Sequence, residues 1–352
     1  MSSMRTAHQP ISSSWPTYRV LCGNALDVLK TLPAASIDMC MTSPPYWGHR
    51  DYDVPGIGSE PTYEAYVSSL CSILDEVRRV LKPQGSLWLN IGDTYKNKGL
   101  CGVPWRVALR LIDEYHWILR NDNIWNKVKG SPDSSQDKLR NIHEYVFHFV
   151  NQKDYYFDID AIRSNPRQSK VVTGRVISAT GVSGIRYKRQ VELSTTLTPA
   201  EKVEALRALN AMLEDVKAKR IADFRMIIRG HQRTTHSDST AVSGRAREID
   251  DRGFYFLKYH PKGSKPADVW DIVPEDTQNR RAHFAPYPAD LCRIPILATC
   301  PREGVVIDPF CGTGTTLVVA KTLGRSAIGI DISQANVDET RQRLADLLID
   351  LT

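Results

Sequence analysis

The first half of the chain alternates short apolar runs with apolar residues at helical spacing. Residues 36–42 (S-I-D-M-C-M-T) and 85–92 (G-S-L-W-L-N-I-G) are short apolar runs, a pattern typical of buried strands. Between them an apolar stripe recurs at steps of three and four, on Tyr63, Val67, Leu70, Leu74, Val77 and Leu81. The stripe predicts an amphipathic helix that is stopped by Pro83 and Gly85.

Strand-like and helix-like segments continue to alternate along most of the chain. Further strands are predicted at 141–150 (N-I-H-E-Y-V-F-H-F-V), 305–308 (V-V-I-D) and 326–331 (S-A-I-G-I-D). Helices are predicted at 104–114, where Pro104 falls in the first turn, at 314–323 and in the C-terminal tail. This alternation predicts an α/β fold with a mostly parallel sheet covered by helices.

The middle of the chain, residues 163–265, breaks this alternation. Thr198, Pro199 and Glu201 form a helix start, followed by an apolar stripe on Leu206, Leu209, Leu213 and Val216. The segment therefore looks like an insertion with a small structure of its own. It holds 21 Lys and Arg against 10 Asp and Glu, whereas the whole chain has a net charge of only +6. The excess suggests a polyanion partner, most simply nucleic acid, although a solvated basic surface explains the charge equally well.

Composition narrows the class of protein. With 352 residues, 41% of them hydrophobic and 24% charged, the chain is typical of soluble globular proteins, and no apolar run is long enough to cross a membrane. Residues 1–14 lack the apolar centre of a signal peptide and read as a flexible leader. Seven cysteines without a C-x-x-C pair favour a reducing cytoplasm. The spacing of His143, Glu144 and His148 misses H-E-x-x-H by one residue, so we predict a structural role for them and no metal.

A candidate cofactor site lies near the C-terminus. V-V-I-D-P-F-C-G-T-G-T-T-L (305–317) predicts a strand, a glycine-containing turn and a helix, and a second strand then ends at Asp331. This geometry can hold a nucleoside cofactor across the strand ends, with the acid on its ribose hydroxyls. Gly312 and Gly314 would let the backbone approach the ligand closely. Leu317 replaces the third glycine of the dinucleotide motif, and the G-x-x-x-x-G-K-[ST] phosphate loop is absent.

Several motifs together carry a family resemblance. D-P-F-C-G-T-G-T-T (308–316) resembles the S-adenosylmethionine loop of amino-group DNA methyltransferases, and T-S-P-P-Y (42–46) resembles their catalytic motif. H-F-A-P-Y-P (283–288) is similar to the motif that precedes the loop. The order, with the catalytic motif first and the basic segment in between, resembles the permuted β group of that family. The resemblance covers nearly all of residues 18–162 and 268–348.

The resemblance implies a class I S-adenosylmethionine-dependent methyltransferase fold with a Rossmann-like mixed sheet. Residues 15–162 and 266–352 would form the catalytic core, and residues 163–265 an inserted target-recognition region. The implied cofactor residues are Asn24, Phe284, Ala285, Pro286, Asp308, Phe310, Gly312, Gly314 and Asp331. Asn24 stands where relatives often carry an acid near the adenine, but an amide can also pair with an adenine edge.

The S-P-P-Y segment is interpreted as a clamp for a flat base. Pro44 and Pro45 restrict the backbone, so that Ser43 Oγ and the Pro44 carbonyl can accept the two hydrogens of an exocyclic amine. That grip would free the nitrogen lone pair for the methyl group. Tyr46 offers a face on which an extruded base stacks, worth about 1–3 kcal/mol. A rigid turn after a core strand is the plainer alternative.

The resemblance also implies the substrate. In this family S-P-P-Y is associated with cytosine N4 and D-P-P-Y with adenine N6, so we expect N4-cytosine methylation of a short sequence in double-stranded DNA, with N6-adenine second. A cognate restriction endonuclease would be a second partner. Methylation of RNA or a protein amide, and DNA binding without catalysis, are the remaining alternatives. The candidates for DNA contact are Arg186, Lys188, Arg189, Arg225, Arg229, His231 and Arg233.

Overall fold

The structure, a computed structural model, describes residues 17–48, 56–130, 134–230, 244–274 and 287–349. The predicted leader, residues 1–14, lies outside these ranges. The chain divides into two compact units: unit 1 combines Met1–Ala161 with Ala267–Thr352, and unit 2 is Ile162–Pro266. Each unit has a hydrophobic core of its own.

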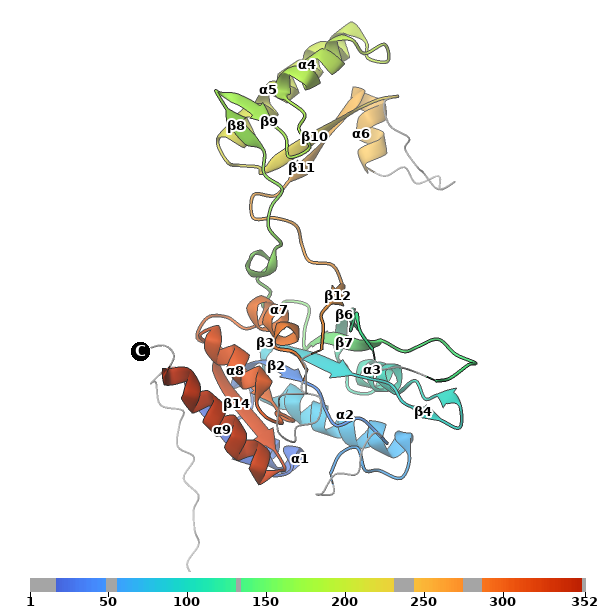
Figure 1. Ribbon diagram of the computed structural model, residues 1–352, viewed down its shortest axis with the longest axis vertical. Coiled ribbons are helices and arrows are strands. Elements are labelled where there is room, and N and C mark those ends of the chain that lie inside the picture. Colours follow the sequence, from blue (N-terminus) through green and yellow to red (C-terminus); the bar gives the residue numbers. More distant parts are fainter. Residues whose placement is uncertain (1–16, 49–55, 131–133, 231–243, 275–286, 350–352) are drawn as a thin grey trace, which may run out of the picture. The chain divides into compact units, whose positions relative to one another are not determined.

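Unit 1 is built around an eight-stranded sheet (Figure 1). Its strands lie in the order β1 (Tyr18–Cys22), β14 (Ser326–Asp331), β13 (Val305–Asp308), β2 (Ile37–Thr42), β3 (Leu81–Ile91), β7 (His143–Val150), β6 (Ile118–Asn126) and β12 (Val269–Asp271). The first five strands in this order, from β1 through β14, β13 and β2 to β3, run parallel to one another. Strand β7 runs antiparallel to both of its neighbours, β3 and β6. The mostly parallel sheet and the five predicted strands are confirmed; β1, β6 and β12 were not predicted.

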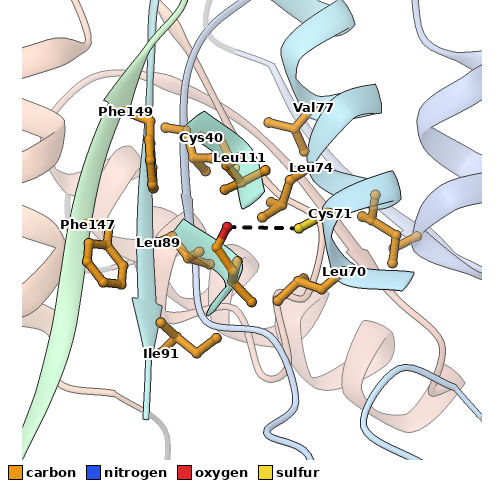
Figure 2. Packing of buried hydrophobic residues seen from close by; sticks show 14 of the residues in the cluster. Cys40, Leu70, Cys71, Leu74, Val77, Leu89, Ile91, Leu111, Phe147 and Phe149 are labelled. Atoms are coloured by element: carbon orange, nitrogen blue, oxygen red, sulfur yellow. Dashed lines mark hydrogen bonds between the residues drawn. The ribbon is translucent and has the colours of Figure 1, made fainter. Parts of the chain in front are cut away.

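Helices cover both faces of the sheet. One face carries α1 (Ala25–Thr31), α2 (Tyr63–Val80) and α3 (Val103–Asp113), and the other carries α7 (Ala289–Thr299), α8 (Thr315–Thr322) and α9 (Gln334–Ile349). Side chains along β2 alternate between the two cores: Cys40 packs with the first, Met39 and Met41 with the second. Figure 2 shows the first core, with Leu70 and Leu74 of α2 near Leu89 of β3.

Helix α2 begins at a local capping residue and ends where the chain pairs with a neighbouring strand. The Thr62 hydroxyl accepts a hydrogen bond from the Ala65 amide and begins the helix. The helix ends at Val80, three residues before Pro83, which corrects the predicted stop. The reason is non-local, because Leu81 already pairs with Ile37 of β2.

The described residues of unit 2 form three helices and two hairpins. Its elements are the hairpin β8 (Lys170–Val172) and β9 (Arg175–Ile177), the hairpin β10 (Asp223–Ile228) and β11 (Phe254–Tyr259), and helices α4 (Gly184–Glu192), α5 (Pro199–Lys217) and α6 (Gly244–Arg252). The predicted start of α5 is confirmed, since Thr198 and Glu201 form a reciprocal capping box. The shorter elements comprise the hairpin β4 (Tyr95–Lys96) and β5 (Gly99–Leu100) of unit 1 and the 3-10 helix η1 (Ile159–Ile162). None of the described helices is long and apolar enough to cross a membrane.

Candidate active site

The S-P-P-Y segment and the glycine-containing turn meet at one edge of the sheet in unit 1. Ser43 follows β2, Asp308 ends β13 and Asp331 ends β14, and β13 lies between the other two strands. Because the three strands are parallel, their carboxyl ends share an edge, which is where open α/β sheets bind ligands. The Thr42 hydroxyl donates a 2.6 Å hydrogen bond to Asp308 Oδ1 and joins the two motifs directly.

The buried Asp308 carboxylate holds this junction together. It accepts hydrogen bonds from the Thr42 and Thr316 hydroxyls, both at 2.6 Å, from the Tyr287 hydroxyl at 3.0 Å and from the Phe310 amide at 3.1 Å. Burial raises the pKa of Asp308, and the hydrogen bonds from Thr316 and Thr42 oppose the rise. A carboxylate has about four acceptor positions, so these donors occupy it. Asp308 thus ties β2 to the turn before α8.

Two glycines shape the turn between β13 and α8. Gly312 and Gly314 have φ values of 51° and 83°, in the left-handed region that favours glycine. A Cβ on Gly314 would lie 2.4 Å from Cγ2 of Thr340, whereas a Cβ on Gly312 would have nothing within 4 Å. Gly314 therefore allows close packing against α9, and Gly312 leaves open space beside the backbone.

Asp331 fastens the same turn to the end of β14. Its Oδ2 accepts the Gly312 amide at 2.9 Å. Its Oδ1 accepts the Ser333 amide at 2.9 Å and the Asn336 side-chain amide at 3.0 Å. Three of the roughly four acceptor positions of the carboxylate are used, which leaves one for a ligand hydroxyl.

The S-P-P-Y segment is braced from several sides. The Tyr66 hydroxyl donates to the Pro45 carbonyl at 2.9 Å. The Tyr46 ring lies so close to Gly92 that a Cβ there would come within 2.8 Å of its Cε2. The Tyr46 hydroxyl donates to Glu144 Oε2 at 2.7 Å. Burial, then the Glu144 charge, raises the pKa of Tyr46 well above its usual value, so its hydroxyl stays a neutral donor.

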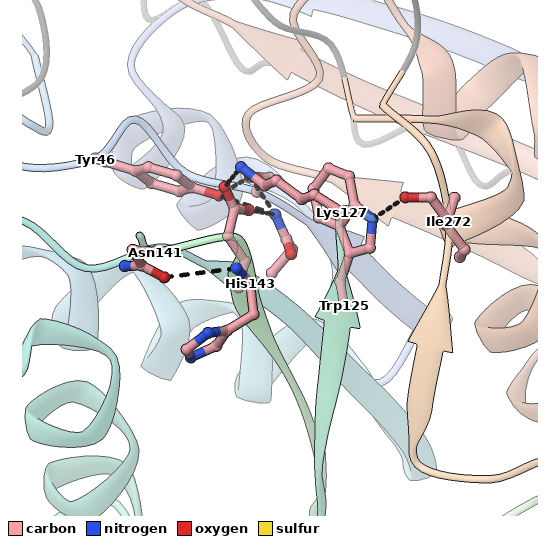
Figure 3. A network of polar contacts seen from close by, with 9 residues as sticks. Tyr46, Trp125, Lys127, Asn141, His143 and Ile272 are labelled. Carbon is pink, nitrogen blue, oxygen red and sulfur yellow. Dashed lines mark hydrogen bonds and ion pairs between the residues drawn. The ribbon is translucent and has the colours of Figure 1, made fainter. Parts of the chain in front are cut away.

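A polar network extends this brace across β3, β7 and the residue after β6. The Asn90 amide nitrogen lies 3.2 Å from Ser43 Oγ and 2.9 Å from both Tyr46 Oη and Glu144 Oε2. Lys127 Nζ donates to Glu144 Oε1 at 2.5 Å. Figure 3 shows Tyr46 and Lys127 converging from opposite sides of this network. Ser43 is thereby held in one orientation at the strand end.

Comparison with known proteins identifies the architecture. The N6/N4 methyltransferase family, described as DNA methylase, matches residues 37–342. The chain belongs to this family. The type II methyltransferase M.SfiI of Streptomyces fimbriatus is 30% identical to this DNA methyltransferase, over 91% of this chain and 89% of that protein. M.SmaI of Serratia marcescens is 27% identical, over 95% and 93% of the two chains.

Solved structures share the fold of this methyltransferase. The PvuII DNA methyltransferase (cytosine-N4-specific) superposes with a TM-score of 0.55 and 17% identity, covering 93% of this chain and 87% of that one. A putative DNA modification methylase from Thermus thermophilus gives a TM-score of 0.52 and 20% identity, covering 94% and 95%. The predicted class I S-adenosylmethionine-dependent methyltransferase fold is confirmed.

The residues around the glycine turn of the methyltransferase fit S-adenosylmethionine. Thr315 is the first residue of α8, and its buried hydroxyl has no hydrogen-bond partner among the described residues. The N-terminal end of a helix favours a negatively charged group such as a carboxylate. The open space beside Gly312 adjoins Asp331 at the end of β14, because the Gly312 amide donates to Asp331 Oδ2. Asn24 Oδ1 accepts the Leu26 amide at 3.0 Å and begins α1. The predicted Phe284, Ala285 and Pro286 lie outside the described residues.

Sequence reasoning missed Asn90, Lys127 and Glu144 as site residues. It placed Glu144 with His148 in a structural strand, and β7 confirms the strand. His148 is buried against Trp88, and this burial lowers the pKa of His148 to about 3. The sequence did contain one signal for Glu144: a carboxylate in an apolar run, which is buried when the run becomes a strand of the sheet. Within the described ranges, no three His, Cys, Asp or Glu side chains could together hold a metal ion.

The predicted DNA-contact residues of the methyltransferase fall into three groups. Arg186, Lys188 and Arg189 are exposed on α4, and Arg225 is exposed on β10. Arg229 is engaged inside unit 2: it pairs with Glu201 at 2.6 Å and donates to the carbonyls of residues 249 and 250. His231 and Arg233 lie outside the described residues.

Proposed function

We propose that this DNA methyltransferase transfers a methyl group to N4 of cytosine within a short sequence of double-stranded DNA. The observation that carries the proposal is the bracing of Ser43 at the end of β2, next to the glycine turn. Asn90 can only donate through its amide nitrogen, 3.2 Å from Ser43 Oγ. One lone pair of Ser43 is engaged in this way, and another is available to a base amine.

The residues of the S-P-P-Y segment would act together on the amine. Ser43 Oγ and the Pro44 carbonyl accept its two hydrogens, and the proline pair keeps these acceptors in place. Tyr46 presents its ring to the extruded base while its hydroxyl is anchored on Glu144. S-adenosylmethionine supplies the methyl group on a sulfonium centre when bound, and these residues orient the amine toward it.

The choice of cytosine rests on Ser43. A serine offers a neutral acceptor, whereas the D-P-P-Y form associated with adenine would place a charge there. The PvuII enzyme, whose fold is similar, is itself described as cytosine-N4-specific. We also assign the protein to the permuted β group, because the S-P-P-Y strand precedes the glycine-turn strand in the chain. Methylation of adenine N6 is the second candidate.

The proposed cofactor contacts follow from the glycine turn. Phe310, Gly312 and Gly314 would surround S-adenosylmethionine, Asp331 would accept a ribose hydroxyl, and the N-terminus of α8 would receive the carboxylate. Asn24 would face the adenine with its amide group. Asp308 would act indirectly, because its acceptor positions already hold the turn and β2 together.

Residues 163–265, which unit 2 contains, are proposed as the target-recognition region. The exposed Arg186, Lys188 and Arg189 of α4, together with Arg225, are the best candidates for phosphate and base contacts. A restriction endonuclease that cleaves the same sequence is the proposed partner, since M.SfiI and M.SmaI are named type II methyltransferases. DNA methylated by the protein should then resist such a nuclease.

The modified nucleoside tests the proposal. Purified protein is incubated with S-adenosylmethionine and mixed-sequence duplex DNA, the DNA is digested, and the nucleosides are identified by mass spectrometry. We expect N4-methylcytosine. N6-methyladenine would overturn the assignment to cytosine but keep the clamp, and methylation of RNA or protein alone would overturn the DNA substrate.

A further inference from the structure

A directional chain of hydrogen bonds leads from Ser43 to the Glu144 carboxylate. Ser43 Oγ lies 3.3 Å from Tyr46 Oη, and Tyr46 Oη donates to Glu144 Oε2 at 2.7 Å. The Asn90 amide nitrogen touches all three oxygens and can only donate. Because the hydroxyl of Tyr46 is committed to Glu144, the Ser43 hydroxyl can donate to Tyr46 Oη. The chain therefore runs from Ser43 through Tyr46 to Glu144.

The negative charge of Glu144 is not needed merely to hold the Tyr46 hydroxyl in place. Glu144 and Asn90 are 8% and 1% exposed, and Glu144 is paired with the partly buried Lys127. A buried ion pair is weak support for stability, because desolvation offsets much of the attraction. A neutral glutamine could accept the same hydrogen bond from Tyr46. What a carboxylate adds is the capacity to take up a proton.

We propose that Glu144 is the terminal proton acceptor for the methylated amine, reached through Ser43 and Tyr46; this inference rests on the proposed function. Methyl transfer forms an N–C bond on the amine while the C–S bond breaks and leaves its electron pair on sulfur. The nitrogen then carries one proton too many. That proton passes to Ser43 Oγ, the Ser43 hydroxyl proton passes to Tyr46 Oη, and the Tyr46 proton passes to Glu144 Oε2.

The step ends with a neutral methylated amine, neutral Ser43 and Tyr46, and a protonated Glu144 beside the Lys127 ammonium. The Lys127 ammonium is the ion-pair partner of Glu144, with Nζ 2.5 Å from Oε1. Lys127 and Tyr46 are the titratable groups that contact Glu144 among the described residues. Glu144 is a positioning and proton-accepting residue that does not itself touch the base, since Tyr46 and Ser43 stand between them.

The test compares Glu144→Gln and Tyr46→Phe in the full chain under single-turnover conditions. Both variants keep the local shape, and Tyr46→Phe keeps the ring for stacking. We expect each to slow methyl transfer by roughly 100-fold, in the range of general acid–base contributions. The affinities for S-adenosylmethionine and DNA should stay within about twofold, since neither variant alters the proposed contacts to these ligands. The wild-type rate should fall on the acid side of its pH profile, and Glu144→Gln should lack that fall.

The control is Glu114→Gln, which removes an exposed carboxylate that pairs with Arg110 at the C-terminal end of α3. It should leave the rate and its pH profile unchanged. Unchanged transfer in Tyr46→Phe, or an unchanged acid-side fall in Glu144→Gln, would overturn the relay. If Glu144→Gln fails to fold, Tyr46→Phe alone decides. Failure of the proposed function is distinguishable, because the wild-type protein would then produce no methylated base.

Discussion

The proposed catalytic side chains of unit 1 and the proposed DNA-contact side chains on α4 of unit 2 are arranged in opposite ways. In unit 1 Asp308, Asn90 and Glu144 are buried at strand ends and bonded to groups far away in the sequence. In unit 2 the basic side chains of α4 are exposed. Under the proposed function, the chemistry depends on a few buried groups that support one another. DNA binding then depends on exposed charges, each of which contributes little.

The strongest way to break the buried arrangement is Asp308→Ala. This change leaves several buried donors without an acceptor, at about 1–3 kcal/mol each, so we expect a loss of roughly 3 kcal/mol or more in unfolding free energy. Urea unfolding of both proteins measures it. Asp290→Ala, at an exposed carboxylate in the first turn of α7, should change stability by less than about 0.5 kcal/mol. Equal stability of Asp308→Ala and wild type would contradict the role of Asp308.

The burial of His148 in unit 1 makes the stability of the fold depend on pH. Burial, then the charge of Arg120, lowers the pKa of His148 from 6.5 to about 3. Between these values the unfolded chain binds a proton that the folded chain refuses, so stability is complete above pH 6.5 and decreases as the pH falls. The slope from this residue approaches about 1.4 kcal/mol per pH unit. Urea unfolding from pH 7 to pH 4 should show a shallower slope for His148→Phe, and an equal slope would contradict the burial.

The exposed residues of unit 2 should behave differently. Replacing Arg186, Lys188 and Arg189 together with alanine should weaken DNA binding by roughly 10- to 100-fold. The salt dependence of binding should decrease by about 0.9 for each phosphate that the variant no longer neutralises. Stability and S-adenosylmethionine affinity should not change. Binding titrations at several salt concentrations measure this effect.

Arg229→Ala is the matched control within unit 2. Because Arg229 pairs with Glu201 and donates to two backbone carbonyls, its loss should lower the stability of unit 2 and leave the salt slope unchanged. If Arg229→Ala reduced the slope as the α4 replacement does, the distinction between engaged and exposed arginines would be wrong.

Much of the fold could be predicted because its signals are local. The stripe from Tyr63 to Leu81 and the apolar runs at 36–42 and 305–308 identify their elements within a few residues of sequence. The capping box at Thr198 is equally local. The hairpin β10–β11 was not predicted. In β10 the buried Phe224, Met226 and Ile228 alternate with less buried positions, but the alternation spans only a few residues of a basic segment. The short edge strand β12 has no signal of its own and depends on pairing with β6.

The candidate site could be predicted only where its signals are local in the sequence. The positions of Ser43 and of the glycine turn follow from motifs and from their family resemblance. The links between them do not, because Thr42 meets Asp308 only through the order of strands in the sheet. Glu144 and Lys127 come together because β6 and β7 are antiparallel neighbours. Single motifs carry no information about such pairings.

The most direct test of the central claim is the transfer step of Ser43→Ala, with Ser72→Ala as the control because Ser72 is exposed on α2. Single-turnover methylation is measured beside the affinities for S-adenosylmethionine and DNA. The account predicts that transfer slows by roughly 100-fold, as when a preorganised polar group is lost from an active site, while both affinities stay within about twofold. Transfer at the wild-type rate would contradict the assignment of Ser43 as the group that grips the amine.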